Sequence, residues 1–159
     1  MLSTFDPHQE VPGNVLIKGE FTSVKVRDPV GPPNVQNLVI DPSKPFDIDV
    51  EWELSGSNAP LYLAALDANW SVEAYAESMG PGPEIQIASA TVPKNGLAYS
   101  TTLHVPASTL PEGNPGNGGP SGVYKLVVTA FLNSSLPGPT GFDIAGFSEG
   151  PMIRVENPR

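Results

Sequence analysis

Residues 46–54 read FDIDVEWEL, and the alternation of apolar and acidic residues in this stretch decides the fold. Every second position is apolar: Phe46, Ile48, Val50, Trp52 and Leu54. The positions between them are acidic: Asp47, Asp49, Glu51 and Glu53. A β-strand points successive side chains to opposite faces, whereas a helix would scatter this pattern around its circumference. The stretch therefore predicts a strand with one packed face and one acidic face.

Turn residues divide the rest of the chain into further extended segments. Gly and Pro supply 16 and 19 of the 159 residues, and they stand between apolar stretches. The expected strands lie at 15–26, 35–40, 46–54, 61–66 with 70–77, 84–92, 98–105 and 122–132, with a last pair at 142–147 and 152–156. Short strands separated by such turns are typical of sandwiches. We predict an all-β protein, an antiparallel β-sandwich of about seven to nine strands with long loops.

The stretch at 61–78, LYLAALDANWSVEAYAES, permits two interpretations. Its alanines and the spacing of Leu63, Leu66 and Trp70 also suit a helix of two to three turns. From residue 70 onward, however, two sets of side chains alternate: Trp70, Val72, Ala74 and Ala76 with Ser71, Glu73, Tyr75 and Glu77. We favour a strand at 70–77, and the choice between strand and helix for 61–77 stays open.

The N-terminal residues are predicted to form an arm before the sandwich. Apolar residues alternate from Val15 to Phe21, and then Val24 continues in the opposite phase. One extra residue near 22–23 explains this shift, as in a β-bulge or where one strand ends and another begins. We expect an arm with an extra strand at 1–31 and the sandwich at 32–159. Such an arm covers an edge of its own sheet or completes that of another copy.

Charge and composition narrow the classes of partner and site. With 8 Lys and Arg against 17 Asp and Glu, the net charge is −9, which argues against nucleic acid and anionic membranes. The chain has no cysteine, so disulfides, thiolate metal sites and a cysteine nucleophile are excluded. No apolar stretch is long enough to span a bilayer, and no secretory signal is visible. The localisation is unknown from these features, and we expect a cytoplasmic protein or part of a larger assembly.

Three stretches together resemble a fibronectin type III or related immunoglobulin-like domain. They are PNVQNL at 33–38 with the strand that carries Trp52, LHVP at 103–106 running into Leu110-Pro111, and GVYKLVVTAF at 122–131 followed by FSEG and MIRVE. The resemblance covers roughly residues 32–156. It implies an immunoglobulin-like sandwich in which Tyr124 forms a tyrosine corner, its hydroxyl bonded to the backbone upstream. It also implies a scaffold for adhesion, spacing or assembly.

The acidic face of 46–54 is the first candidate site. Side chains two apart on a strand are separated by roughly 6.6–6.8 Å, whereas calcium needs six to eight oxygens at roughly 2.3–2.6 Å. One strand cannot provide these ligands, so loop residues such as Asp41 or Asp67 would have to contribute. We expect a solvated face with exposed carboxylates, no metal and no cofactor, and calcium binding at 47–53 stays open.

No residue set predicts catalysis. His8 lies in the polar N-terminal segment, and His104 alternates with Leu103 and Val105, so it is expected to point outward. A pair of carboxylates roughly 5–9.5 Å apart hydrolyses glycosidic bonds. Adjacent acids on one strand meet that distance, but no feature predicts a raised pKa for one of them. We therefore expect no enzyme, with a glycoside-type hydrolase as an alternative.

The strand at 122–132 has two largely apolar faces. The face opposite Tyr124 holds Val123, Lys125, Val127, Thr129 and Phe131. The outer side of a two-sheet sandwich is normally wet, so this face predicts a cover. The cover would come from the N-terminal strand, from the segment at 55–83 or from another subunit. The candidate interaction residues are Val123, Val127, Phe131, Trp70 and Tyr75.

Aromatic side chains allow an alternative, since two or three exposed rings in one plane would stack on a sugar. The rings in question are Trp70, Tyr75, Tyr62 and Tyr99. Half-buried aromatics are also ordinary residues of a sheet. The sequence therefore predicts a non-catalytic structural or assembly module that acts through protein–protein contacts, with itself or another protein. A carbohydrate-binding module is the alternative.

Overall fold

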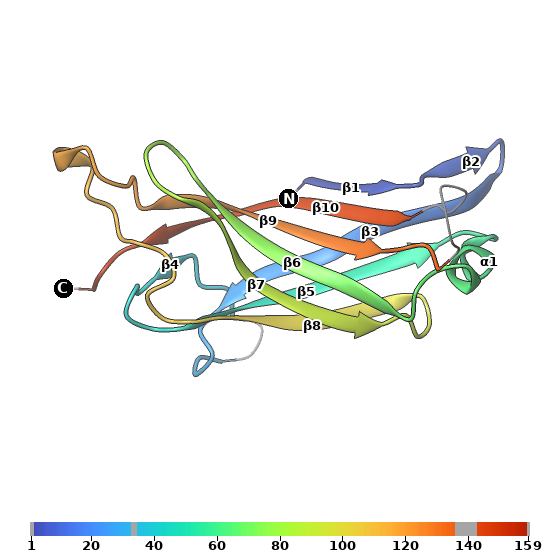
Figure 1. Ribbon diagram of the computed structural model, residues 1–159, viewed down its shortest axis with the longest axis horizontal. Coiled ribbons are helices and arrows are strands. Elements are labelled where there is room, and N and C mark those ends of the chain that lie inside the picture. The colour runs from blue at the N-terminus through green and yellow to red at the C-terminus, as the bar shows by residue number, and fades with distance from the viewer. Residues whose placement is uncertain (1, 33–34, 136–142, 159) are drawn as a thin grey trace.

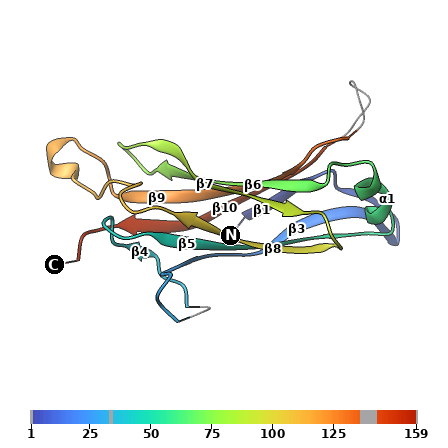
Figure 2. The same cartoon turned by 60° about the horizontal axis from the view of Figure 1, so that its bottom comes forward.

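The structure, a computed structural model, describes residues 2–32, 35–135 and 143–158 as two packed β-sheets (Figure 1). The first, called the β9 sheet, contains in order β1 (Leu2–Asp6), β10 (Ile144–Val155), β9 (Val123–Leu132), β6 (Asn69–Ser78) and β7 (Glu84–Pro93), with β4 (Val39–Ile40) also beside β10. The second, called the β5 sheet, contains in order β2 (Gln9–Val11), β3 (Asn14–Arg27), β5 (Phe46–Ser55) and β8 (Ala98–Val105). Figure 2 shows the two layers from the side.

The predicted all-β antiparallel sandwich is confirmed. Every strand pairing is antiparallel except that of β4 with β10. Within the described residues there are ten strands rather than seven to nine, because the N-terminal segment supplies three of them. A short helix, α1 (Ala59–Ala64), closes one end, and a 3-10 turn, η1 (Pro115–Asn117), lies at the other (Figure 1).

The core lies between the sheets and contains both Trp52 and Tyr124, as the alternations predict. Trp52 on β5 stacks on Tyr99 of β8 with ring centroids 5.5 Å apart. It also meets Trp70 of β6 edge-on at 5.7 Å, so the aromatic rings join the two sheets. Burying such large side chains is the main source of stability in a sandwich of this size.

Three predicted segments have different structures. The choice left open at 61–77 falls to a strand at 70–77, as favoured, but residues 61–64, in a segment considered as a strand, belong to the helix α1. Pro60 suits the first turn of a helix, and alanine favours its interior. The strand at 35–40 is reduced to β4. The last predicted pair, whose residue 142 lies outside the described residues, is the single strand β10, which passes through Gly150 and Pro151 with a shift of register between Glu149 and Met152.

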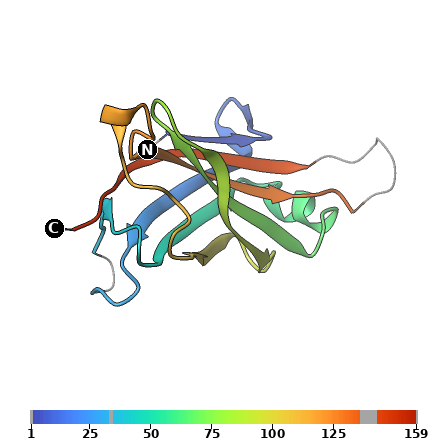
Figure 3. The same cartoon turned by 60° about the vertical axis from the view of Figure 1, so that its left-hand side comes forward.

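The N-terminal segment belongs to both sheets of its own chain. β1 runs antiparallel to β10, and β3 runs antiparallel to β5 (Figure 3). The predicted bulge is present, because the pairing with β5 shifts register between Phe21 and Ser23. Residues 2–27 thus contribute three strands to the sandwich instead of one extra strand outside it.

Candidate interaction surface

The acidic strand β5 is central, and its neighbours carry the partners of its carboxylates. Arg27 on β3 donates to Asp49 Oδ2 at 2.7 Å and to Asp47 Oδ2 at 3.3 Å. From β8, the Thr102 hydroxyl donates to Asp49 Oδ1 at 2.8 Å, and His104 Nδ1 lies 2.7 Å from Asp47 Oδ1. The prediction that all four acids are mainly exposed is therefore wrong for Asp47, whose side chain is 7% exposed.

The contacts of Asp49 change its pKa, the property on which glycosidase catalysis by the acidic face would depend. The hydrogen bond from Arg27 lowers the pKa of Asp49 below its ordinary value. A general acid in a glycosidase needs the opposite, a raised pKa. In the part of the chain that the structure describes, no group of three or more His, Asp or Glu side chains is placed to hold a metal ion. The arrangement resembles a surface ion-pair network on a sheet.

Two of the four aromatic candidates are inside the protein. Trp70, also proposed above as an interaction residue, is fully buried, and Tyr99 is 6% exposed. The Tyr99 hydroxyl donates to the carbonyl of Gly96 at 2.6 Å. Neither ring presents a surface on which a sugar would stack.

The other two tyrosines are half-buried and lie on different elements. Tyr62 on α1 donates to Gln9 Oε1 at 2.6 Å, and Tyr75 on β6 donates to the Glu73 carboxylate. They therefore form no single stacking platform. The remaining candidates, Val123, Val127 and Phe131, all lie on the outward side of β9.

The sheet brings a further aromatic residue to this side. Phe147 of β10 is opposite Thr129 of β9, and Tyr75 of β6 is opposite Val127. Directly opposed residues share a face of the sheet. Phe147 is 49% exposed and Phe131 is 36% exposed. We call the outward side chains of Tyr75, Val127, Phe131 and Phe147 the aromatic face.

Charged residues lie beside the members of the aromatic face, since Glu149 is opposite Val127 and Glu73 is opposite Thr129. Lys125 Nζ is 3.5 Å from Glu77 Oε2 and 4.0 Å from Glu149 Oε1. Within the described residues, neither predicted intrachain cover lies over the face. β1 extends the same sheet beyond β10, and the segment at 55–83 contributes β6 to that sheet. The aromatic face is thus a mixed surface in which apolar and charged side chains are neighbours, and non-obligate protein interfaces are mixed in the same way.

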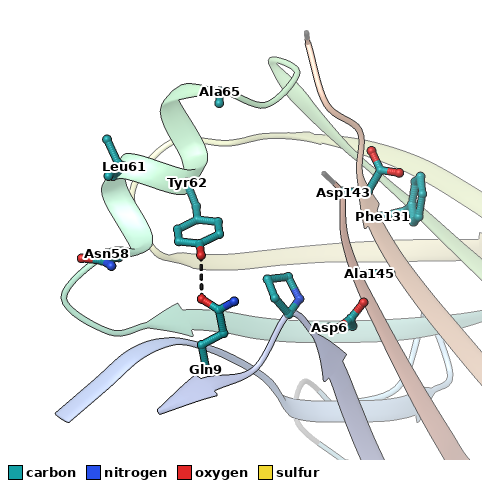
Figure 4. Close-up of a pocket in the computed structure, with 10 residues that line it drawn as sticks. Asp6, Gln9, Asn58, Leu61, Tyr62, Ala65, Phe131, Asp143 and Ala145 are labelled. Carbon is teal, nitrogen blue, oxygen red and sulfur yellow. Dashed lines mark hydrogen bonds between the residues drawn. The ribbon is translucent and has the colours of Figure 1, made fainter. Parts of the chain in front are cut away.

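Two hollows border Phe131. The larger, about 820 Å³, lies between α1, the corner from β1 to β2, and the ends of β9 and β10 (Figure 4). The smaller, about 250 Å³, runs over the outer side of β6, β9 and β10 between Phe131 and Phe147. Phe131 and Ala145 line both hollows, so the two hollows are neighbours, and we call them together the groove.

Sequence reasoning named Val127 and Phe131 on β9 and Tyr75 on β6, and it missed Phe147 on β10. Phe147 stands in a stretch whose pairing partner depends on the register of β10, which local alternation does not reveal. Arg27, Thr102 and His104 were missed as partners of the acids for the same reason.

No protein-family model matches the chain, and no curated protein matches it. In the described residues, no helix has the length and apolar character needed to cross a membrane.

Proposed function

We propose that the chain is a non-catalytic β-sandwich assembly module that associates with a second copy of itself through the aromatic face. The exposure of Phe131 and Phe147 on two neighbouring inner strands of one sheet, β9 and β10, carries this proposal. Adjacent exposed aromatic rings on a sheet are a feature of interaction sites, because their burial releases ordered water and supplies large contact area. A contact about a two-fold axis would pair the same face from each copy.

A fibronectin type III or immunoglobulin-like origin is part of the proposal. Its support is the position of Tyr124 at the start of β9, with the hydroxyl donating to the carbonyl of Pro111 at 2.9 Å. This is the bond that the resemblance implies, although it reaches 13 residues upstream. Domains of this architecture often present sheet surfaces to other proteins, and the surface residues rather than the fold decide the partner.

Charge sets the conditions under which the contact forms. Two copies each carry a net charge of −9 and repel one another at low ionic strength. Salt screens this repulsion, while the burial of the Phe131 and Phe147 rings is not weakened by screening. Association through the aromatic face should therefore strengthen as salt is added.

The experiment compares the solution mass of the wild type with that of the double variant Phe131→Ser/Phe147→Ser by light scattering after gel filtration. We expect the wild type to associate at high micromolar concentration and the double variant to remain a single chain. Val30→Ser is the matched control, since Val30 is 92% exposed on a loop away from the face. Equal masses for the wild type and the double variant would refute the proposal.

A further inference from the structure

The larger hollow has walls from three parts of the chain (Figure 4). On one side stands α1, with Leu61 and Tyr62 facing the opening. The opposite side holds Phe131 of β9 and Asp143 at the start of β10. The corner from β1 to β2 contributes the remaining wall, which includes Asp6 and Gln9.

Specific contacts hold these walls in place. The Tyr62 hydroxyl donates to Gln9 Oε1 at 2.6 Å, which ties α1 to β2. Lys94, after β7, donates through Nζ to the carbonyls of Leu63 and Leu66 at the C-terminal end of α1. Leu63 is buried in the core and fixes the inner side of the helix. The hollow is therefore formed before any ligand arrives, which lowers the entropy cost of binding.

The groove combines apolar walls with one sign of charge. The apolar side chains include Leu61, which is 72% exposed, and Phe131. The charged side chains that line the two hollows are Asp6, Glu73 and Asp143. Among the residues that the structure describes, no Lys or Arg lines either hollow.

The Asp143 carboxylate is oriented by the fold. The backbone N–H of Ser134 donates to its Oδ1 at 2.8 Å. Carboxylates at the rim of an apolar groove attract a cation and reject an anion, so the groove selects by charge as well as by shape.

We propose that this groove binds an extended segment of a partner protein in which apolar side chains alternate with Lys or Arg. The apolar side chains would occupy the larger hollow against Leu61 and Phe131, and the cations would lie beside Asp6, Asp143 and Glu73. A polypeptide segment fits the site because the two hollows are neighbours across Phe131 and Ala145, so that one extended chain can reach both. The groove shares Phe131 with the aromatic face, so the bound segment and a second copy would compete for this residue. The inference goes beyond self-association and is tested at Asp6, Leu61 and Asp143, which lie outside that face.

The test uses the full chain and two synthetic pentapeptides with blocked ends. In the basic peptide Lys alternates with Leu and Phe, and in the acidic peptide Glu replaces each Lys. Each is titrated into ¹⁵N-labelled protein while amide signals are followed by nuclear magnetic resonance. We expect the basic peptide to shift the signals of Gln9, Leu61 and Ala145, and the acidic peptide to leave them unchanged. If the two peptides shift these signals equally, or if neither shifts them, the proposal is overturned.

Substitutions in the groove then test whether its carboxylates and Leu61 bind the basic peptide. Asp6→Asn/Asp143→Asn preserves the size of both side chains and should weaken binding of the basic peptide about fivefold, as for the loss of two exposed ion pairs. Glu51→Gln, on the outer side of the other sheet, should leave the affinity unchanged. Leu61→Ser should also weaken binding of the basic peptide, although it leaves the charge of the groove unchanged. Binding that is unaffected by Asp6→Asn/Asp143→Asn and by Leu61→Ser would contradict the assignment.

The outcome is separate from that of the self-association proposal. None of these groove variants should alter the concentration dependence of the solution mass, since they leave Phe147 and Val127 in place. Circular dichroism of each variant confirms that a loss of peptide binding is not a loss of fold.

Discussion

At the scale of single residues, Phe5 shows how the N-terminal strand is fastened to the sandwich. The ring is 6% exposed and lies between Gly146 of β10 and Gly19 of β3. A Cβ atom added at either glycine would overlap the ring. Because neither glycine has a side chain, the Phe5 ring of β1 has room to reach the core between the two sheets.

A pair of substitutions tests this arrangement. Gly146→Ala should lower the free energy of unfolding by about 1–3 kcal/mol, because the added methyl group overpacks against Phe5. Phe5→Ala should lower it by about 3 kcal/mol. In the Phe5→Ala background the cost of Gly146→Ala should nearly vanish, since the ring is gone. Urea unfolding of the four proteins measures the coupling, and additive effects would mean that the ring and the glycine do not share this space.

The pair formed by Arg27 and Asp49 makes stability depend on acid pH. Because the hydrogen bond from Arg27 lowers the pKa of folded Asp49, this group stabilises the fold above the pKa of the unfolded chain. The contribution is lost as the pH falls through the lowered pKa of the folded state. Arg27→Gln should therefore flatten the fall in unfolding free energy below about pH 5. Lys18→Gln, an equal change of charge on the same strand at a position opposite Ser55, should keep the steeper fall. Identical profiles for the two variants would contradict the pairing.

At the scale of elements, α1 depends on a cation from outside the helix. Lys94 Nζ donates to the carbonyl of Leu63 in the last turn of α1 and to that of Leu66 just beyond the helix, and a cation is favourable at this end of a helix. Lys94→Met should cost about 1–2 kcal/mol of unfolding free energy, the value of hydrogen bonds to a charged donor that is partly exposed. Lys44→Met should leave the unfolding free energy almost unchanged, because the Lys44 side chain is 71% exposed. Thermal unfolding of both variants decides the point, and equal midpoints would show that Lys94 does not stabilise the helix.

The elements that alternate strictly were predictable, and those set by turn geometry were not. Residues 46–54 and 122–132 form strands where the period of two places them. β10 was expected as two strands because Gly150-Pro151 marks a turn in most chains, yet Gly150 adopts φ +96° and the pairing with β9 resumes at Met152. The helix at 59–64 follows from Pro60 and neighbouring alanines, a local signal that agrees with the helical alternative left open for this stretch.

The aromatic face was predictable only in part, because alternation along one strand does not show which side is buried or which strand lies beside it. Alternation separates Trp70 from Tyr75 on the two faces of β6, but it does not say which face is buried. The core takes Trp70 because Val72, Ala74 and Ala76 lie with it, all within 1% of complete burial. Phe147 joins Phe131 only through the register of β10 against β9, so tertiary structure was needed to find the aromatic face.

At the scale of the whole molecule, the two sheets have outer sides of different character. The outer side of the β5 sheet carries carboxylates paired with Arg27, Thr102 and His104. The outer side of the β9 sheet carries the aromatic face and, toward α1, the acidic groove. This asymmetry supports a module that makes its contacts through the β9 sheet.

Sedimentation equilibrium of the wild-type chain is the measurement that tests this claim most directly. The average mass is determined from about 10 µM to 1 mM protein, the range in which weak self-association appears, and at about 0.05 M and 0.5 M salt. We expect the mass to rise with concentration toward twice that of a single chain, and to rise at lower concentration in high salt. A mass equal to that of one chain under all of these conditions would contradict assembly through the aromatic face.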